Sequence, residues 1–529
     1  MSLEIPLKFN LATYFLDRPA QEHPGRTAIL GEPYAVSYGE LARLAARAGA
    51  ALAQTGCAPG ERLLIALPDS VEFMAAFFGA TRIGAVAVPV NPMTRTANYS
   101  YYLADSGARL AIVHAGTLPE FLPACQGAAL ERMVVVGAWQ EAPHSEKLLK
   151  WSEWLALAGV EGEAYATSAT DTAFFLYTSG SGGQPKAAVH QHKDMLVTSR
   201  SFAQGVLGLR ADDRTFSVSK LFFAYGLGNG MYFPLSVGAS TLLNPERPRP
   251  ERVAELIARH RPTVFFAVPT FYAAMLREVE RGLPADLSSV RLAVSAGETL
   301  PAEIFEQFRR QFGLEILDGI GSTEMLQMFI SSRPGQARPG SCGVEVPNYE
   351  AKIVDDAGAP VPAGEIGNLW VKGASAFTGY WQKPELTART KRGDWVVTGD
   401  KFIRSADGYY HYCGRADDMM KVAGMWVWPG EVENVLLGHP LVAEAAVVGS
   451  SDMVGLMRPV AHVVLRAGAV AGQGLAEEIR AYVRMRLVSY KCPQEICFCE
   501  ELPKTATGKI QRFRLREAAR GGKLNRDRA

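Results

Sequence analysis

The stretch Tyr177-Thr-Ser-Gly-Ser-Gly-Gly-Gln-Pro-Lys186 separates an apolar run at residues 173–176 from a second short run at residues 186–190. Its glycines can adopt positive φ, which lets consecutive backbone N–H groups converge on one point. The hydroxyls add further donors and the lysine adds a positive charge, so we predict a loop between two strands that holds polyphosphate. The residues expected to contact phosphate are Thr178, Ser179, Gly180, Ser181, Gly182, Gly183 and Lys186.

This loop differs from the P-loop of nucleoside triphosphatases, which reads G-x-x-x-x-G-K-[ST] and opens directly into a helix. Here Pro185 precedes the lysine and Ala187 follows it. A short strand is therefore expected after the loop, followed by a helix from His192 to about Val206. For the loop taken alone, a flexible Gly/Ser surface segment remains the simpler interpretation.

Length and composition indicate an ordinary soluble globular protein with more than one domain. A chain of 529 residues exceeds what one hydrophobic core supports. The net charge of +1 gives no reason to expect nucleic acid or an anionic membrane as partner. The N-terminus has no signal pattern and no apolar stretch is long enough to span a bilayer. Seven scattered cysteines fit a reducing cytoplasm.

Alternation of helix-like and strand-like patterns at residues 38–90 and 251–318 predicts parallel α/β sheets covered on both faces. Short strands with Gly, Pro and Asp turns at residues 349–412 predict a small β subdomain. A further α+β stretch of about one hundred residues follows, a typical domain size. We expect a large N-terminal domain at residues 1–414, a polar connector at 415–418 and a small α+β domain at 419–529.

Four further motif segments follow the loop along the chain. They are Gly321-Ser-Thr-Glu324, Thr398-Gly-Asp400, Gly414-Arg-Ala-Asp-Asp418 with Lys421 and Gly424, and Pro503-Lys-Thr-Ala-Thr-Gly-Lys509. With these segments in this order, the chain resembles the adenylate-forming superfamily of acyl- and aryl-CoA synthetases, peptide-synthetase adenylation domains and luciferases, from about Tyr14 to Arg516. Residues 220–228 and 321–326 resemble the benzoate-CoA ligase branch.

The resemblance implies a two-step reaction that uses ATP, Mg²⁺ and coenzyme A. A carboxylic acid attacks the α-phosphate to give acyl-AMP, and a thiol then displaces AMP. Lys509 would reach the attacking carboxylate and the α-phosphate, Thr323 would bind the α-phosphate, and Glu324 would hold Mg²⁺. Taken alone, Lys509 reads as a solvated surface lysine, and Ser322 to Glu324 read as the cap and first turn of a helix.

The resemblance also implies a nucleotide site. Asp400 would bind the ribose hydroxyls and Arg415 would add a second contact, although an ordinary turn aspartate is the alternative for Asp400. Two segments that end predicted strands would sandwich the adenine. Ile320 stands where the family commonly has tyrosine, and Gly182 where it usually has threonine. The implied nucleotide-binding residues are Ala296, Gly297, Glu298, Asp318, Gly319, Ile320, Gly321, Thr323, Asp400 and Arg415.

In the family the small C-terminal domain rotates between the two steps, which makes it a mobile lid. The resemblance places the hinge at Asp417 and the tunnel for coenzyme A beside Gly424. Trp428 would cover coenzyme A or the surface between the domains, and a plain packing role for it stays open. Trp428-Pro429 keeps proline at the first helical position but loses the serine cap that the family commonly has.

The acid pocket implied by the resemblance suits a planar ring better than a fatty chain, because small residues leave a flat slot beside Tyr225. Benzoate ligases commonly have histidine where this chain has Gln327. That amide could accept a hydrogen bond from a ring amino or hydroxyl group, or could bond only backbone or water. The expected acid is benzoate or a substituted benzoate such as 2-aminobenzoate (anthranilate) or hydroxybenzoate. The implied pocket residues are Ala224, Tyr225, Ala296, Gly297, Gly321, Gln327 and Met328.

Three other functions share parts of this pattern. An adenylating enzyme that loads an aryl acid onto a carrier protein remains the main alternative, although no carrier domain is evident. Intact Lys509, Glu324 and Asp400 count against a non-catalytic nucleotide-binding protein. A luciferase-like oxygenase shares the fold, but no motif demands O₂. The expected partners are the aromatic acid, ATP and coenzyme A, with the protein a cytoplasmic monomer or homodimer.

Overall fold

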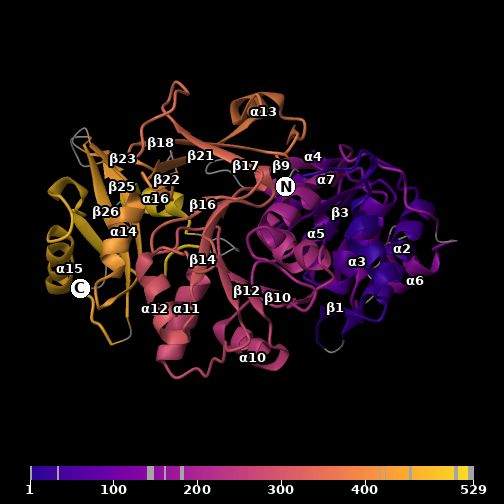
Figure 1. The fold of residues 1–529 in the computed structure, drawn as a ribbon, viewed down its shortest axis with the longest axis horizontal. Coiled ribbons are helices and arrows are strands. Elements are labelled where there is room, and N and C mark those ends of the chain that lie inside the picture. The colour runs from indigo at the N-terminus through magenta and orange to yellow at the C-terminus, as the bar shows by residue number, and fades with distance from the viewer. Residues whose placement is uncertain are drawn as a thin grey trace.

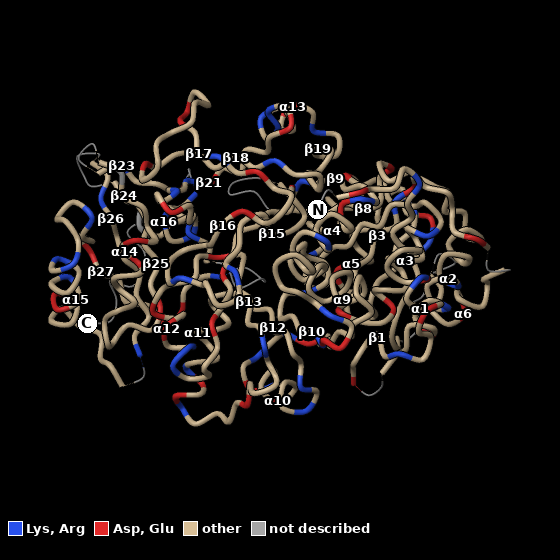
Figure 2. The backbone as a smooth tube through the Cα atoms, viewed as in Figure 1, with Lys and Arg blue, Asp and Glu red and all other residues tan. Residues whose placement is uncertain are grey.

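The computed structural model describes residues 3–32, 35–139, 148–159, 162–178, 184–415, 418–422, 425–451, 456–466, 468–504 and 510–521. The described chain forms mixed α/β sheets with a separate C-terminal part (Figure 1). Figure 2 shows lysine and arginine positions interspersed with aspartate and glutamate positions along the described chain, in agreement with the near-zero net charge. No helix in the described part of the chain is long and apolar enough to cross a membrane.

The first sheet contains the predicted phosphate hairpin at one end. It is parallel from β7 to β8, and β9 and β19 then join antiparallel. In spatial order its strands are β19 (Gly379–Tyr380), β9 (Lys186–Gln191), β8 (Thr172–Thr178), β4 (Val86–Pro89), β3 (Arg62–Ala66), β5 (Leu110–His114), β6 (Arg132–Val136) and β7 (Leu148–Lys150).

The second sheet is parallel through its central strands and antiparallel at both edges. In spatial order its strands are β16 (Val344–Glu345), β15 (Met328–Ser331), β14 (Ile316–Gly321), β13 (Leu292–Ser295), β12 (Val264–Ala267), β10 (Arg214–Ser217), β11 (Ser240–Leu242), β1 (Thr27–Leu30) and β2 (Val36–Ser37).

Helices cover these sheets, and their starts follow from local capping. Ser37 and Glu40 form a capping box at the start of α2 (Tyr38–Gln54), and Ser70 caps α3 (Val71–Arg82). The other helices are α1 (Arg18–Glu22), α4 (Thr96–Ser106), α5 (Leu118–Ala124), α6 (Trp151–Ala156), α7 (His192–Thr198), α8 (Ala224–Leu227), α9 (Phe233–Leu235), α10 (Pro250–His260), α11 (Pro269–Glu280) and α12 (Ala302–Phe312).

Short helical turns of other kinds connect these elements. The helix predicted from His192 to Val206 is confirmed in part, because α7 gives way to a π-helical segment at its end. These segments are η1 (Thr13–Asp17), η2 (Ala115–Thr117), η3 (Ser199–Gln204), η4 (Gly228–Tyr232), η5 (Thr323–Met325) and η6 (Ser489–Lys491).

The predicted small β subdomain is an antiparallel sheet that lies at the top of the molecule, between its two ends, in the view of Figure 1. Helix α13 (Pro384–Thr390) packs beside it. Its strands are β17 (Tyr349–Val354), β18 (Ile366–Gly373), β21 (Trp395–Arg404), β20 (Lys391–Arg392) and β22 (Tyr410–Arg415).

The C-terminal part has an apolar core of its own, formed by described residues between Met420 and Phe498. The last strand ends at Phe498, where its pairing with β26 ends. Its elements are β23 (Met420–Val422), β24 (Met425–Val427), α14 (Pro429–Leu437), β25 (Val442–Ser451), β26 (Met457–Leu465), α15 (Gln473–Arg484), β27 (Glu495–Phe498) and α16 (Arg512–Gly521).

Candidate functional site

A cavity of about 1210 Å³ lies between the strand ends of the large N-terminal part and the C-terminal part. From the N-terminal side it is lined by the ends of β8, β9 and β14 and by the middle of β21. From the C-terminal side it is lined by residues of α14 and α16. Motif segments that are hundreds of residues apart in the sequence therefore meet at one site.

The predicted phosphate loop connects two antiparallel strands, as expected. Thr178 at the end of β8 pairs with Lys186 at the start of β9, and both residues line the cavity. Ser179, Gly180, Ser181, Gly182 and Gly183 lie outside the described residues, so their contacts stay a prediction.

Both ends of this hairpin connection are anchored to α4. The Tyr177 hydroxyl donates to Asp105 Oδ2 at 2.9 Å, and the Tyr101 hydroxyl donates to the carbonyl of Pro185. Lys383 Nζ donates to the other oxygen of Asp105 at 2.5 Å. Asp105 and Tyr101 could not be predicted as anchors, because no local pattern in α4 signals that the helix will face a distant loop.

Tyr380 connects the lysine of the phosphate hairpin to the expected magnesium ligand. Its hydroxyl donates to Glu324 Oε1 at 2.5 Å and accepts from Lys186 Nζ at 2.8 Å. All three residues line the cavity, and burial lowers the pKa of Lys186. Tyr380 lies on β19, which pairs with β9 at Ala188. That pairing brings it beside Lys186 across 194 residues of sequence, so sequence analysis could not identify it.

Thr323 and Glu324 lie on a single 3₁₀ turn that faces the cavity. Ser322 caps this turn, since its hydroxyl accepts a hydrogen bond from the N–H of Met325 at 3.2 Å. The capping interpretation of this motif is therefore confirmed, although the turn does not continue into an α-helix. Capping also leaves the two following side chains exposed to the cavity, so the structural and binding interpretations are compatible.

Asp400 lies in the middle of β21, so the interpretation as an ordinary turn aspartate is wrong. Gly399 before it adopts φ +75° inside the strand, which is what made the sequence resemble a turn. Asp400 pairs across the sheet with Arg415, whose Nη1 lies 3.2 Å from Asp400 Oδ1 and 2.9 Å from the carbonyl of Thr398. Both Asp400 and Arg415 line the cavity.

The two segments expected to hold the adenine follow adjacent parallel strands, with Ser295 of β13 in register with Asp318 of β14. Ala296 and Asp318 are buried beneath the cavity wall, and burial raises the pKa of Asp318 to about 8. The members of these segments that line the cavity are Gly297, Glu298, Gly319, Ile320 and Gly321.

The residues expected to bind the acid lie close together but mostly behind this wall. Ala224 and Tyr225 open α8, and the Tyr225 hydroxyl donates to the carbonyl of Val294 at 3.2 Å. Gln327 and Met328 are buried. Of the predicted pocket residues, Gly297 and Gly321 line the 1210 Å³ cavity, whereas Ala224, Tyr225, Ala296, Gln327 and Met328 do not.

The amide of Gln327 makes the backbone contacts that the sequence analysis left open as an alternative. Its Nε2 donates to the carbonyls of Ala224 at 3.2 Å and Tyr225 at 3.1 Å, while its Oε1 accepts from the N–H of Met328 at 3.3 Å. A Cβ at Gly228 would lie 2.3 Å from this Nε2, so the Gln327 amide would have to move to admit any side chain there. Gln327 therefore connects the start of β15 to α8.

Family models match most of the chain. Residues 16–381 match the AMP-binding enzyme family, and residues 431–509 match the AMP-binding enzyme C-terminal domain. The chain belongs to the AMP-binding enzyme family. A benzoate–CoA ligase of Thauera aromatica is 42% identical to this AMP-binding enzyme over 521 residues, which is 98% of this chain and 97% of the relative. An anthranilate–CoA ligase of Pseudomonas aeruginosa is 37% identical over 468 residues, 87% of each chain.

Solved structures agree with this assignment. An anthranilate CoA ligase in complex with anthranoyl-AMP superposes on this AMP-binding enzyme with a TM-score of 0.93 at 40% identity, covering 97% of this chain and 98% of the other. A benzoate CoA ligase from Burkholderia xenovorans gives a TM-score of 0.89 at 44% identity, covering 96% and 100%.

The C-terminal part of this AMP-binding enzyme presents α14 and α16 to the cavity. Arg512 of α16 donates to both oxygens of Glu433 on α14, at 2.9 and 2.8 Å, and the charge of Glu433 raises the pKa of Arg512. Trp428 precedes α14 without a side-chain cap, as predicted, and Lys491 Nζ lies 4.6 Å from its ring centroid. Asp417, Gly424 and Lys509 lie outside the described residues.

Proposed function

We propose that this AMP-binding enzyme is an ATP-dependent aryl-CoA ligase. An aryl acid reacts with ATP to give aryl-AMP and pyrophosphate, and coenzyme A then displaces AMP to give the thioester. Relatives named benzoate–CoA and anthranilate–CoA ligase align with most of the chain, which supports this reaction. The observation that carries the proposal is the meeting of Lys186, Thr323 and Glu324 with Asp400 and Arg415 around one cavity.

In the first step a carboxylate oxygen of the acid attacks the α-phosphorus, and the bond from that phosphorus to pyrophosphate breaks. Two anions approach each other, so the site must supply positive charge and hydrogen-bond donors. We assign Lys186 and the loop hydroxyls to the β- and γ-phosphates and Thr323 to the α-phosphate. Lys509 is assigned to the attacking carboxylate, and Asp400 with Arg415 to the ribose.

In the second step the thiol of coenzyme A attacks the acyl carbon, and the bond to the AMP oxygen breaks. We assign Gly424 and Trp428 to the path of coenzyme A and Asp417 to the hinge that changes the arrangement. Lys491 beside the Trp428 ring holds that ring against η6, a contact that suits packing as well as binding.

Glu324 is the residue proposed to hold Mg²⁺. Its carboxylate faces the cavity beside Lys186, and Mg²⁺ is typically bound by one or two carboxylates together with phosphate oxygens and water. Among the described residues no group of three or more His, Cys, Asp and Glu side chains forms a ready-made cage. When bound, the ion would neutralise phosphate charge, while Tyr380 orients the carboxylate that holds it.

The arrangement of the two parts supports the adenylating state. Ile510 and Gln511, which directly follow Lys509, line the same cavity as Thr323 and Glu324. No described residue of β23 or β24, the strands that flank Gly424, lines it. We therefore propose that this structure represents the arrangement for the first step.

Aryl acids are the proposed substrates, with benzoate or a ring-substituted benzoate favoured by the relatives. Release of AMP should be measured with benzoate, 2-aminobenzoate, hydroxybenzoates and a medium-chain fatty acid, each with ATP and coenzyme A. We expect turnover with at least one aryl acid and little with the fatty acid. Aryl-AMP formation without transfer to coenzyme A would instead favour a carrier protein as acceptor.

The protein is proposed to act in the cytoplasm, as a monomer or homodimer. All seven cysteines are free thiols, which suits a reducing compartment.

A further inference from the structure

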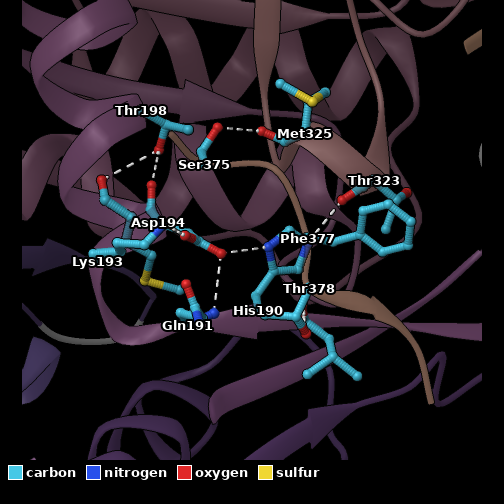
Figure 3. Close-up of polar contacts among 12 residues, drawn as sticks. His190, Gln191, Lys193, Asp194, Thr198, Thr323, Met325, Ser375, Phe377 and Thr378 are labelled. Atoms are coloured by element: carbon cyan, nitrogen blue, oxygen red, sulfur yellow. Dashed lines mark hydrogen bonds and ion pairs between the residues drawn. The ribbon is translucent and has the colours of Figure 1, made fainter. Parts of the chain in front are cut away.

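His190 lies directly behind the turn that carries Thr323 and Glu324 (Figure 3). Its ring is fully buried, with Nε2 2.8 Å from the carbonyl oxygen of Thr323 and Nδ1 2.9 Å from Asp194 Oδ2. A carbonyl oxygen only accepts, so Nε2 carries a hydrogen and donates it. His190 thus contacts the nucleotide side of the site although it lies outside the cavity.

The ring of His190 is held in one orientation from several directions. Asp194 Oδ2 also accepts from the N–H of Gln191 at 2.9 Å, and Lys193 Nζ lies 3.2 Å from the other carboxylate oxygen. Phe174 stacks against the imidazole with a centroid separation of 5.1 Å and an interplanar angle of 16°. These contacts leave the imidazole little freedom, so the position of Nε2 is fixed relative to β9.

Every carbonyl of the 323–325 turn is held from outside. Thr323 is bound by His190, the carbonyl of Glu324 accepts from the N–H of Phe377 at 2.7 Å, and that of Met325 accepts from Ser375 Oγ at 2.8 Å. Among these three contacts, His190 supplies the one that comes from the phosphate hairpin. The turn is therefore fixed to the same strand that begins with Lys186.

The spacing along β9 makes this connection specific. Residues 186 and 190 are four apart, so they lie on the same face of the strand. Lys186 reaches Tyr380 and His190 reaches Thr323, and the Tyr380 hydroxyl closes the loop by binding Glu324. Lys186 and His190, both on β9, thereby set the position of Glu324, the proposed metal ligand, relative to Lys186, the proposed phosphate ligand.

We propose that His190, anchored by Asp194, is a positioning residue for the adenylation step. It fixes the Thr323 carbonyl, and through it the place of the Thr323 and Glu324 side chains opposite Lys186. The inference rests on the proposed aryl-CoA ligase function, because that function assigns Thr323 and Glu324 to ATP. Under this proposal, the positions of the Thr323 and Glu324 side chains depend on one hydrogen-bond donor, the Nε2–H of His190.

The test compares variants that keep or remove that donor. His190→Gln places an amide N–H near the position of Nε2, whereas His190→Met fills the site with no donor. We expect H190M to slow pyrophosphate exchange about 100-fold, which is the effect of misplacing a reacting group by roughly 1 Å. H190Q should recover most of that loss, and thioester formation from supplied aryl-AMP should fall much less than exchange in H190M.

His192 provides a matched control. It is also fully buried, but its Nδ1 accepts from the N–H of Leu11 at 3.2 Å and it does not contact the turn. H192M should lower the melting temperature as H190M does without a selective loss of adenylation. Equal losses in H190M and H192M, or no recovery in H190Q, would overturn the proposal. If H190M does not fold, His190→Asn tests the same point, because its shorter amide cannot reach the carbonyl.

Wild-type turnover separates this inference from the proposed function. Failure of the wild type to form any aryl adenylate would contradict the function alone. In that case the variants can still be ranked by their affinity for ATP in the absence of acid, measured by intrinsic protein fluorescence. H190M binding ATP more weakly than H192M would support the positioning role, and equal binding would reject it.

Discussion

The N-terminal and C-terminal parts hold their cavity residues in different ways. In the N-terminal part, buried hydrogen bonds fix the 323–325 turn, and Asp105 anchors the end of the phosphate hairpin. The C-terminal part meets it through ion pairs such as Arg277–Glu444 at 2.7 Å and Arg466–Glu280 at 3.3 Å. Buried hydrogen bonds are lost only on unfolding, whereas partly exposed ion pairs exchange readily for water. The N-terminal half of the site therefore keeps its geometry in the folded protein, and we call it the permanent side. The contacts of the C-terminal half can break and re-form without unfolding, and we call it the replaceable side.

The largest expected effect comes from Lys509→Ala, on the replaceable side. Removing the ammonium that meets the carboxylate and the α-phosphate should slow aryl-AMP formation by about 10²–10³-fold or more. Thioester formation from supplied aryl-AMP should stay near the wild-type rate, because the lysine serves only one arrangement. Both half-reactions can be followed by pyrophosphate exchange and by release of AMP. Equal loss in the two would contradict the division of roles.

Asp417→Pro should give the opposite pattern. Proline fixes φ, and forcing it through an incompatible backbone conformation opposes movement by about 3 kcal/mol, roughly a hundredfold in rate. Pyrophosphate exchange should survive while overall production of the thioester falls. Lys421→Ala provides a neighbouring variant with free backbone torsions for comparison. Unimpaired overall turnover in D417P would place the hinge elsewhere.

Gln327→Leu tests the permanent side. The substitution leaves the carbonyls of Ala224 and Tyr225 without their hydrogen-bond donor. The unpaired carbonyls should lower the free energy of unfolding by about 1–3 kcal/mol. Because the amide bonds backbone, we expect kcat/KM to fall by a similar factor for benzoate and 2-aminobenzoate, with the KM for ATP unchanged. A much larger loss for 2-aminobenzoate would restore the hypothesis that Gln327 selects the ring substituent.

The smallest effect is expected from Glu444→Gln, which weakens the contact between the two parts. Burial opposes the charge of Glu444, but Lys504 and Arg277 outweigh it and lower the pKa from the ordinary value of 4.5. The ion pair is therefore present above about pH 4.5 and lost as the pH falls further. The ratio of the two half-reaction rates should shift only about twofold to fivefold, since such pairs contribute up to about 1 kcal/mol. Added salt should shift the ratio of the two wild-type half-reaction rates in the same direction as the variant. A wild-type ratio that does not change with salt would contradict a role for this ion pair.

Much of the fold follows from local patterns. The helix-like and strand-like patterns predicted at residues 38–90 correspond to helices and strands of the first sheet, and α2 begins there at a capping box. The phosphate hairpin was predicted from glycines between two apolar runs. The turn assigned to Asp400 was wrong because a glycine with positive φ also occurs within a strand. Local sequence does not distinguish these two settings.

The site was predicted only where its residues lie in compact motifs. Tyr380, Asp105 and His190 act through partners 56 to 278 positions away, and no spacing rule links them. Which strand neighbours which is decided by packing of the whole sheet. Residues that hold the motifs in place are therefore visible only in the structure, whereas those within the motifs can be read from the chain.

Gly228 and Gln327 have a consequence for enzyme engineering. A Cβ at position 228 would lie 2.3 Å from the amide nitrogen of Gln327, so the two positions share one volume. In a library that randomises position 228 alone, every variant with a Cβ would have to displace the Gln327 amide from its backbone partners. A paired library, in which a shorter residue at 327 accompanies alanine or serine at 228, would keep that volume filled while moving the carbonyls at the start of α8. Altered acid preference should therefore be sought in pairs of substitutions at these positions.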